Sequence, residues 1–187
     1  MKSNTYIALA VFAFVVALAA SGSSSDRVPI ERPIEAARIE VHKKDRLLKL
    51  YSADQLIRQF SIGLGFNPKR PKHREGDGAT PEGLYSICVK NPKSKYFLSL
   101  GISYPNPADA ERGMDSGLIS KEQYRDIIEA HKRGIRPPWN TRLGGEIFIH
   151  GSGSSADWTW GCIALDNGDM LELYNAVRIG TKVEIKP

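Results

Sequence analysis

The chain has 187 residues, which suits one domain preceded by a targeting segment. Its formal net charge is +5, from 26 Lys and Arg against 21 Asp and Glu. A basic surface suits a polyanionic environment such as a cell envelope or nucleic acid. The basic residues are scattered, however, and a solvated loop explains their local cluster at Lys69 to Arg74 at least as well as a binding patch. We therefore expect no nucleic-acid partner.

The first 21 residues have the layout of a secretory signal. Lys2 gives a positive start, an uncharged apolar run from Thr5 to Ala20 follows, and small residues come after it. The run is shorter than the roughly 20 residues that cross a bilayer comfortably, although an uncleaved membrane anchor is the alternative interpretation. We expect residues 1–21 to be removed, the protein to be exported to the periplasm or cell envelope, and no stable membrane span to be left after cleavage.

Residues 22–36 are polar, contain two prolines and are predicted to form a linker to a domain at 37–187. Apolar residues then alternate with polar ones, which is typical of half-buried strands. The first three alternating segments predict a β-meander, and further strands are expected nearer the C-terminus. The apolar positions of the meander are Ile39 and Val41, then Leu48 and Leu50, then Phe60, Ile62 and Leu64; the later strands are expected at 84–89, 147–149 and around Val183 and Ile185.

Two helices are predicted. Ser120 and Gln123 have the spacing of a capping box and begin the first, which Gly134 and Pro137 end. Asp166 or Asn167 caps the second, and its expected inward positions are Met170, Leu171, Tyr174 and Val177. Residues 102–119 and 134–146 are expected to be irregular, and loops of that length commonly shape a cleft. The predicted fold class is therefore mostly β with two short helices, an α+β domain.

The stretch from Ile147 to Leu165 carries the chemistry-bearing residues. His150 ends a short buried strand, and Cys162 follows Gly161. A thiolate is a nucleophile, and a nearby imidazole can take its proton. Glycine before the cysteine lets a substrate carbonyl approach, and the Gly161 and Cys162 N–H groups are candidate oxyanion donors. The carbonyl of Gly151 is a candidate for orienting the histidine.

By spacing alone, a lone histidine and a lone cysteine are more often structural than catalytic. A metal site has less support, because the chain lacks a Cys-x-x-Cys or His-x-x-x-His pair. Cys88 lies on a predicted strand in apolar company and is interpreted as a small buried residue. Pairing of Cys88 with Cys162 is possible in an exported protein, but we expect Cys162 to be a free thiol.

These residues resemble the L,D-transpeptidase catalytic domain family, also called the YkuD family. Its signature is a histidine, a variable stretch, Ser or Thr, any residue, Gly, Cys and a hydrophobic residue. The matching residues here are His150, Gly151, Thr159, Gly161, Cys162 and Ile163. Segments 76–85, with Thr80-Pro81-Glu82-Gly83, and 97–106 are supporting matches, so the resemblance spans about residues 37–186.

The resemblance implies an L,D-transpeptidase-like β-sandwich or mixed sheet, no metal or other cofactor, and peptidoglycan stem peptides as substrate. Cys162 would attack the carbonyl of the third stem residue, expel D-alanine and form a thioester, with His150 as base and then acid. An amine from another stem or from a protein would resolve the thioester. Gly161, Gly151, Thr159 and Trp160 would shape the pocket and the oxyanion site.

Three departures from the family pattern leave the acceptor open. Trp160 stands where many members have histidine, Ala164 stands where many have arginine or asparagine, and the stretch between His150 and Cys162 is short. Three hypotheses follow. The chain joins stem peptides as a transpeptidase, or it cuts them as a carboxypeptidase or amidase of the same fold. The third is a non-catalytic envelope-binding domain with a structural cysteine.

Overall fold

The predicted β-meander opens the domain. In the computed structural model, which describes residues 28–187, three strands pair antiparallel in chain order: β1 (Ala37–His42), β2 (Leu47–Ser52) and β3 (Gln55–Ser61). The alternating apolar side chains point to one face and are almost fully buried, as the period of a strand requires. They are Ile39, Val41, Leu48, Leu50 and Phe60.

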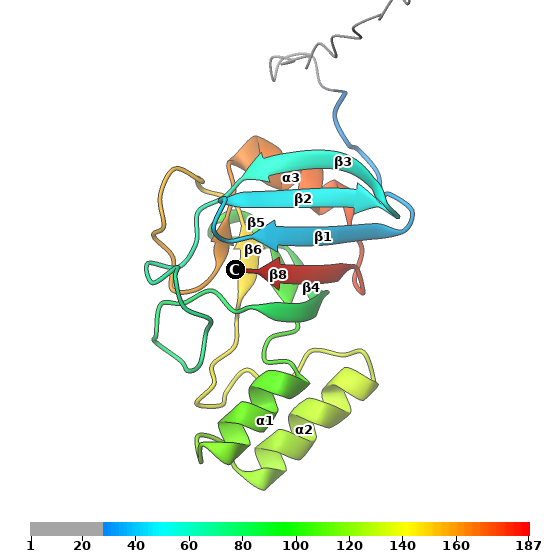
Figure 1. Ribbon diagram of the computed structural model, residues 1–187. Helices are drawn as coiled ribbons and strands as arrows, with labels where there is room; N and C mark the ends of the chain where they lie inside the picture. The colour runs from blue at the N-terminus through cyan, green and yellow to red at the C-terminus, as the bar shows by residue number, and fades with distance from the viewer. Residues whose placement is uncertain (1–27) are drawn as a thin grey trace, which may run out of the picture.

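The remaining strands extend this meander into one eight-stranded sheet (Figure 1). They are β4 (Gly83–Ser94), β5 (Phe97–Ile102), β6 (Phe148–His150), β7 (Ile163–Ala164) and β8 (Lys182–Lys186). The strand order is β3-β2-β1-β8-β4-β5-β6-β7. The pairs β1–β8 and β6–β7 are parallel and the others antiparallel, so the predicted mixed sheet is confirmed. The last strand of the chain lies between the meander and β4, and joins the two halves.

The two ends of the sheet also meet. Beyond β3, the Gly63 N–H donates to the Ala164 carbonyl at 2.9 Å, and the Ala164 N–H donates back to Gly63 at 2.8 Å. Gly65 forms a second bridge, to Thr159. The sheet is thus bent around its own core, as a half-barrel rather than two stacked sheets. A continuous cluster of buried apolar side chains from all eight strands or their extensions and from α3 (Asn167–Ala176) fills the interior.

The second predicted helix is present as α3, and its inward face differs in one position from the prediction. Met170 and Leu173 are fully buried, and Val177 at the end of the helix is buried as well. Leu171, predicted to face inward, is 46% exposed. Residues 170 and 173 lie on one helical face, three positions apart, and residue 171 is turned about 100° away from 170 at 3.6 residues per turn.

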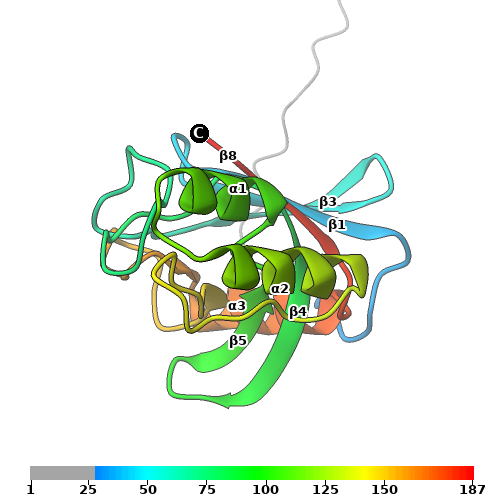
Figure 2. The same ribbon diagram turned by 90° about the horizontal axis from the view of Figure 1, so that it is seen from below.

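The other two helices lie side by side, away from the meander (Figure 2). α2 (Lys121–Lys132) begins with the predicted capping box of Ser120 and Gln123. α1 (Pro107–Asp115) lies within 102–119, so the prediction of an irregular segment there was wrong, and residues 28–187 form three helices rather than two. α1 has few apolar residues, and its start depends on a reciprocal cap between Asn106 and Asp109. The pair has a small core of its own with Ala110, Ile119, Ile127 and Leu143.

Residues 1–27, which hold the predicted signal and part of the predicted linker, lie outside the described residues. From residue 28 onward the chain contacts the domain. Ile30 and Ile34 pack against the core, and the Ile34 N–H donates to the Ala176 carbonyl at 2.8 Å. None of the helices formed within residues 28–187 has the length and apolarity that a bilayer crossing requires.

The meander offers a matched pair of leucines for a stability test. Leu50 on β2 is 0% exposed, whereas Leu56 on β3 is 49% exposed. Leu50→Ala should lower the free energy of unfolding by about 2–5 kcal/mol, because it leaves a cavity in a packed core. Leu56→Ala should cost less than about 0.5 kcal/mol. Urea unfolding followed by circular dichroism measures both; equal losses would contradict the described burial.

Candidate functional site

The site lies where β6 and β7 run side by side. Their parallel register places Ile149 beside Ile163 and His150 beside Ala164. β6 is fixed on its other side by β5, with Ser99 opposite His150. The nucleophile candidate Cys162 immediately precedes β7, and its sulfur accepts a hydrogen bond from the Phe148 N–H on β6 at 3.4 Å. Short paired strands therefore bring together two residues that are twelve positions apart in the chain.

His150 is held in one tautomer. Its side chain is buried, and Nδ1 lies 2.7 Å from the Gly151 carbonyl, the contact that the sequence led us to expect. A carbonyl oxygen only accepts, so Nδ1 carries the proton and Nε2 of the neutral ring keeps a lone pair. A side chain at position 151 would meet the Asn167 Oδ1 atom at 2.5 Å, which explains the glycine.

Two aromatic rings fix the plane of the imidazole. Tyr96 stacks on it with ring centres 4.6 Å apart, and Trp158 meets it edge-on at 5.5 Å. The Tyr96 carbonyl also accepts the Gly151 N–H at 3.0 Å. Trp158 is 40% exposed and Trp160 is 69% exposed, so both indoles border the site and neither belongs to the core.

The turn before the cysteine depends on Thr159 and Gly161. The Thr159 hydroxyl donates to the Cys162 carbonyl at 2.7 Å and accepts the Gly161 N–H at 3.2 Å. That N–H is therefore already bonded within the turn. Gly161 has φ +122°, and a side chain there would lie 2.6 Å from the Ala79 carbonyl. The glycine is required by contact with the 76–83 loop and by its own backbone angle, a reason different from the substrate approach inferred from the sequence.

The sulfur of Cys162 borders two cavities. One, of about 470 Å³, also contains His150 and is lined by the β4–β5 hairpin; its other lining residues include Lys93, Lys95, Tyr96, Ser99 and Glu146. The second, of about 310 Å³, is lined by Lys72, Glu75, Glu146 and Trp160. Histidine, cysteine and a space for a substrate thus occur together, which is the arrangement that covalent catalysis by a thiol needs.

Burial makes both reactive groups neutral at rest. It raises the pKa of the Cys162 thiol, and hydrogen bonding from Phe148 and the charge of Lys72 only partly oppose the shift. Burial likewise lowers the pKa of His150, although the Gly151 carbonyl acts in the other direction. At neutral pH the pair is therefore a thiol and an uncharged imidazole, and the imidazole is available to take the thiol proton during attack.

The long loop 65–83 forms the far wall of the second cavity and is held by two buried lysines. Lys72 is 3% exposed and forms an ion pair with Asp77 at 2.9 Å. Lys43 is 2% exposed and donates to Glu82 and to the Arg70 and Thr80 carbonyls. The basic cluster of the loop is thus not fully solvated, because Lys72 faces inward.

A model of the family described as the L,D-transpeptidase catalytic domain, YkuD, matches residues 36–185. The chain belongs to the L,D-transpeptidase catalytic domain family. YafK of Escherichia coli K12, itself named for the L,D-transpeptidases, is 30% identical over 115 residues. That alignment covers 52% of this chain and 45% of YafK, so the chain matches about half the length of this curated relative.

Two solved structures share the fold of this chain. The helical cell shape determining protein Pgp2 of Campylobacter jejuni, as its K307A mutant, aligns with a TM-score of 0.56 at 25% identity. The alignment covers 80% of this chain and 46% of Pgp2. Bd1075 of Bdellovibrio bacteriovorus aligns with a TM-score of 0.54 at 19% identity, over 84% of this chain and 51% of Bd1075.

Several residues of the L,D-transpeptidase domain site were not foreseen from the sequence. Tyr96, Glu146 and the Phe148 N–H all contact the reactive pair, and Lys72 acts on the thiol through its charge. Tyr96 directly precedes the matched segment 97–106, which was its only signal. Ala164, interpreted as a lost polar contact, is fully buried and pairs with Gly63.

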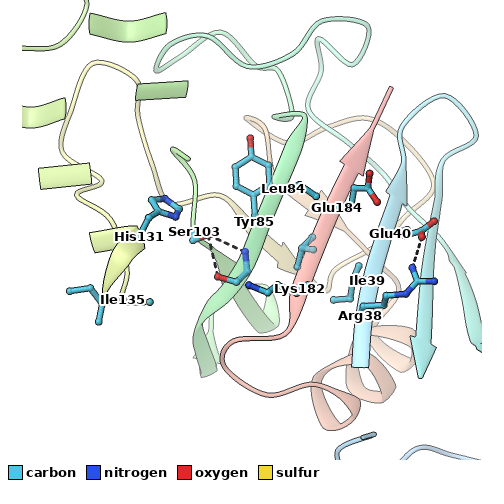
Figure 3. A pocket seen from close by; sticks show the side chains of 13 residues that line it. Arg38, Ile39, Glu40, Leu84, Tyr85, Ser103, His131, Ile135, Lys182 and Glu184 are labelled. Atoms are coloured by element: carbon cyan, nitrogen blue, oxygen red, sulfur yellow. Dashed lines mark hydrogen bonds and ion pairs between the residues drawn. The ribbon is translucent and has the colours of Figure 1, made fainter. Parts of the chain in front are cut away.

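A separate cavity of about 430 Å³ lies on the outer face of β1, β8 and β4, next to the end of α2 (Figure 3). It is lined by charged and polar side chains such as Arg38, Glu40, Lys182 and Glu184, with His131 on its helical side. His131 Nε2 lies 2.8 Å from the Pro105 carbonyl, so its ring ties the end of α2 to the segment before α1. Neither Cys162 nor His150 lines this space, so thioester chemistry does not belong there.

The second cysteine is set apart from the site. Cys88 on β4 is half-buried rather than fully buried, its thiol donates to the Gly101 carbonyl at 3.4 Å, and burial raises its pKa to about 11. Both cysteines are free, as expected for Cys162.

Among residues 28–187 no three His, Cys, Asp or Glu side chains are grouped so as to hold a metal ion.

The neutral resting pair can be tested without any substrate. The reaction of Cys162 with iodoacetamide should rise with pH, with a midpoint above the roughly 8.5 of an ordinary cysteine. At neutral pH, His150→Ala should slow it roughly 100-fold, the lower end of the effect of losing a general base. Peptide mapping by mass spectrometry follows each cysteine, and Cys88 is the control within the same molecule. An unchanged Cys162 rate in the variant would remove His150 from the role of base.

Proposed function

We propose that the protein is a cysteine-dependent L,D-transpeptidase that acts on peptidoglycan stem peptides through a Cys162 thioester. The observation that carries the proposal is that Cys162 and His150 line one cavity from neighbouring strands, with His150 fixed in the tautomer that leaves Nε2 as base. Membership of the family supports the substrate class. The chain would then contribute to cell wall biogenesis and organisation.

Acylation follows from this geometry. As the sulfur attacks the carbonyl carbon of the third stem residue, the thiol proton passes to His150 Nε2. The C–N bond to the terminal D-alanine then breaks, and the same proton goes from His150 to the leaving nitrogen. The Cys162 N–H is our candidate for stabilising the oxyanion, because the Gly161 N–H is already bonded to Thr159. Thr159 holds the turn that aims this group.

The cavity that contains His150 has the charge expected of a site for the acyl donor. Lys93 and Lys95 line it from the β4–β5 hairpin, both are exposed, and Lys95 lies 5.0 Å from the centre of the Tyr96 ring. Two cations there suit the carboxylates of a stem peptide, including that of its terminal residue. We infer that the donor stem binds along this hairpin and presents its third residue to the sulfur.

Hydrolysis of the same thioester is the second candidate. The exposed indoles of Trp158 and Trp160 leave the border of the site in contact with solvent, so water reaches the neighbourhood of the acyl group. An L,D-carboxypeptidase or amidase would use the same two residues with water in place of the amine. Transfer is our first choice, and the similarity to Pgp2, a helical cell shape determining protein, is compatible with a role in cell shape.

The purified domain incubated with a disaccharide tetrapeptide tests the proposal. We expect a covalent acyl adduct on Cys162, release of D-alanine, and dimers or exchanged peptides once an acceptor is added, all detected by mass spectrometry. Cys162→Ala should abolish every product. Cys88→Ala is the matched control and should retain activity at a stability cost of about 1 kcal/mol. Tripeptide and free D-alanine alone, at any acceptor concentration, would move the assignment to a carboxypeptidase.

We also propose that the protein is exported, on the basis of Lys2, the apolar run and the small residues after it. The mature N-terminus should fall between Ser21 and Asp26, outside the cytoplasmic membrane. N-terminal sequencing of protein recovered from cell envelopes measures this. Recovery of the full-length N-terminus from the soluble cytoplasm would refute export.

A further inference from the structure

Glu146 lies beside Cys162, between the two cavities. Among residues 28–187, Glu146 and Cys162 are the two that line both the cavity containing His150 and the cavity beside Trp160. The carbonyl of Glu146 accepts the Cys162 thiol, with the sulfur 3.7 Å from the oxygen. The residue thus stands at the boundary between the two spaces, with its backbone against the reacting atom.

The backbone of Glu146 is held in an unusual conformation. Its φ is +54°, in the left-handed region that side chains other than glycine rarely adopt, although two glycines, Gly144 and Gly145, precede it. The next residue is anchored to the sheet, since the Ile102 N–H donates to the Ile147 carbonyl at 3.0 Å. Non-glycine residues forced into this region gather at functional sites, and here the residue in that conformation lies in the wall of both cavities.

The charge around the second cavity is negative. Glu75 and Glu146 both line it, and within residues 28–187 neither forms an ion pair. Lys72 is the cation in its wall, but that charge is matched by Asp77 at 2.9 Å. The negative charge of Glu146 also opposes ionisation of Cys162, raising the pKa of the thiol. Glu146, which lines the cavity without an ion pair among residues 28–187, is therefore available to a cationic ligand.

We infer that the Glu146 carboxylate binds the ammonium group of the incoming acceptor and holds its nitrogen beside the thioester. The acceptor would enter through the 310 Å³ cavity, between Glu75 and Trp160, while the donor stem occupies the cavity lined by Lys93 and Lys95. This inference rests on the proposed function, and it assigns an acceptor-binding residue that the sequence did not suggest. One cavity would then bind the carboxylates of the donor, and the other would bind the ammonium group of the acceptor.

The transfer step balances with groups already present. The bound ammonium first loses one proton to solvent water. The neutral nitrogen then forms a bond to the thioester carbonyl carbon, and the C–S bond breaks. His150 Nε2 takes the second proton from the nitrogen and gives it to the departing sulfur, so the thiol and the neutral imidazole are restored. Glu146 fixes the position of the nitrogen, which is the part of the reaction that proximity accelerates.

Glu146→Gln keeps the size of the side chain and removes its charge. With a disaccharide tetrapeptide as donor, the variant should form the Cys162 acyl adduct as fast as the wild type or faster. Transfer to a D-amino acid or a second stem should fall roughly tenfold, seen as a higher KM for the acceptor. Transfer to hydroxylamine, which is uncharged at neutral pH, should be unchanged. Glu129→Gln, an exposed position on α2, makes the same charge change away from the site and should match the wild type throughout.

The outcomes separate the two proposals. Equal transfer to the D-amino acid in the variant and the wild type, with acyl adduct formed in both, overturns the role of Glu146 and leaves the thioester mechanism in place. An equal loss with hydroxylamine also overturns it, because a general disturbance of the turn would affect both acceptors. A wild-type enzyme that forms the adduct but transfers it only to water overturns the acceptor role as well. Absence of any adduct in the wild type overturns both proposals.

Discussion

The geometry of the site depends on the pairing of residues 63–65 with residues 159–164. Gly63 and Ala164 exchange two backbone hydrogen bonds, and Gly65 bridges to Thr159. These contacts join the chain leaving β3 to β7, which is the opposite end of the sheet. A sheet bent into a half-barrel would otherwise leave its short last strand exposed at an edge, where two residues pair too weakly to hold a nucleophile.

Glycines make this closure possible. A side chain on Gly63 would lie 2.1 Å from the Ala156 carbonyl, and one on Gly65 would lie 2.1 Å from the Gly78 carbonyl. Gly161 meets the Ala79 carbonyl in the same way. Three backbone segments therefore pack directly on one another at the turn that carries Cys162. The 65–83 loop and the turn before Cys162 therefore pack as one unit. The two buried lysines that hold the loop also support the position of this turn through it.

Local patterns in the sequence predicted most of the strands and the reactive pair. The alternation of apolar and polar residues at Ile39 and Val41, or at Val183 and Ile185, depends only on which face of the strand is buried. All four of these apolar residues are buried, as predicted. The insertion of β8 between β1 and β4 depends on contacts between residues about a hundred or more positions apart, which no local pattern encodes. α1 was missed because it has few apolar residues and because its cap pairs Asn106 with Asp109, rather than the Ser or Thr and Glu or Gln of the usual capping box.

The residues of the site likewise divide into those that the sequence predicted and those that it did not. His150 and Cys162 carry chemistry in their residue types and a family signature in their spacing, so sequence alone selected them. Tyr96 and Glu146 are brought to the site by position. Tyr96 lies far along the chain from Cys162, and Glu146 contacts the thiol through a backbone conformation that the sequence does not show. The structure gives a second reason for Gly161 that the sequence could not supply, because its close neighbour is a loop eighty residues earlier. Residues whose side-chain chemistry suggests a role could be selected from the sequence. Residues whose role depends on their three-dimensional position could not.

In the proposed mechanism, the neutral state of the resting pair would shape how the site discriminates between substrates. A preformed thiolate would react with any electrophile that reached it, whereas a buried thiol beside an uncharged imidazole reacts when a carbonyl is held in line with both. Burial thus transfers part of the selectivity from the nucleophile to the cavities that position its partners. Under the proposed function, the basic residues of the cavity that contains His150 and the acidic residues of the cavity beside Trp160 would decide which peptides are joined. Glu146 lines both cavities, and its carbonyl accepts the Cys162 thiol. In the inferred mechanism, the residue whose backbone restrains the thiol would therefore also carry the charge that binds the amine.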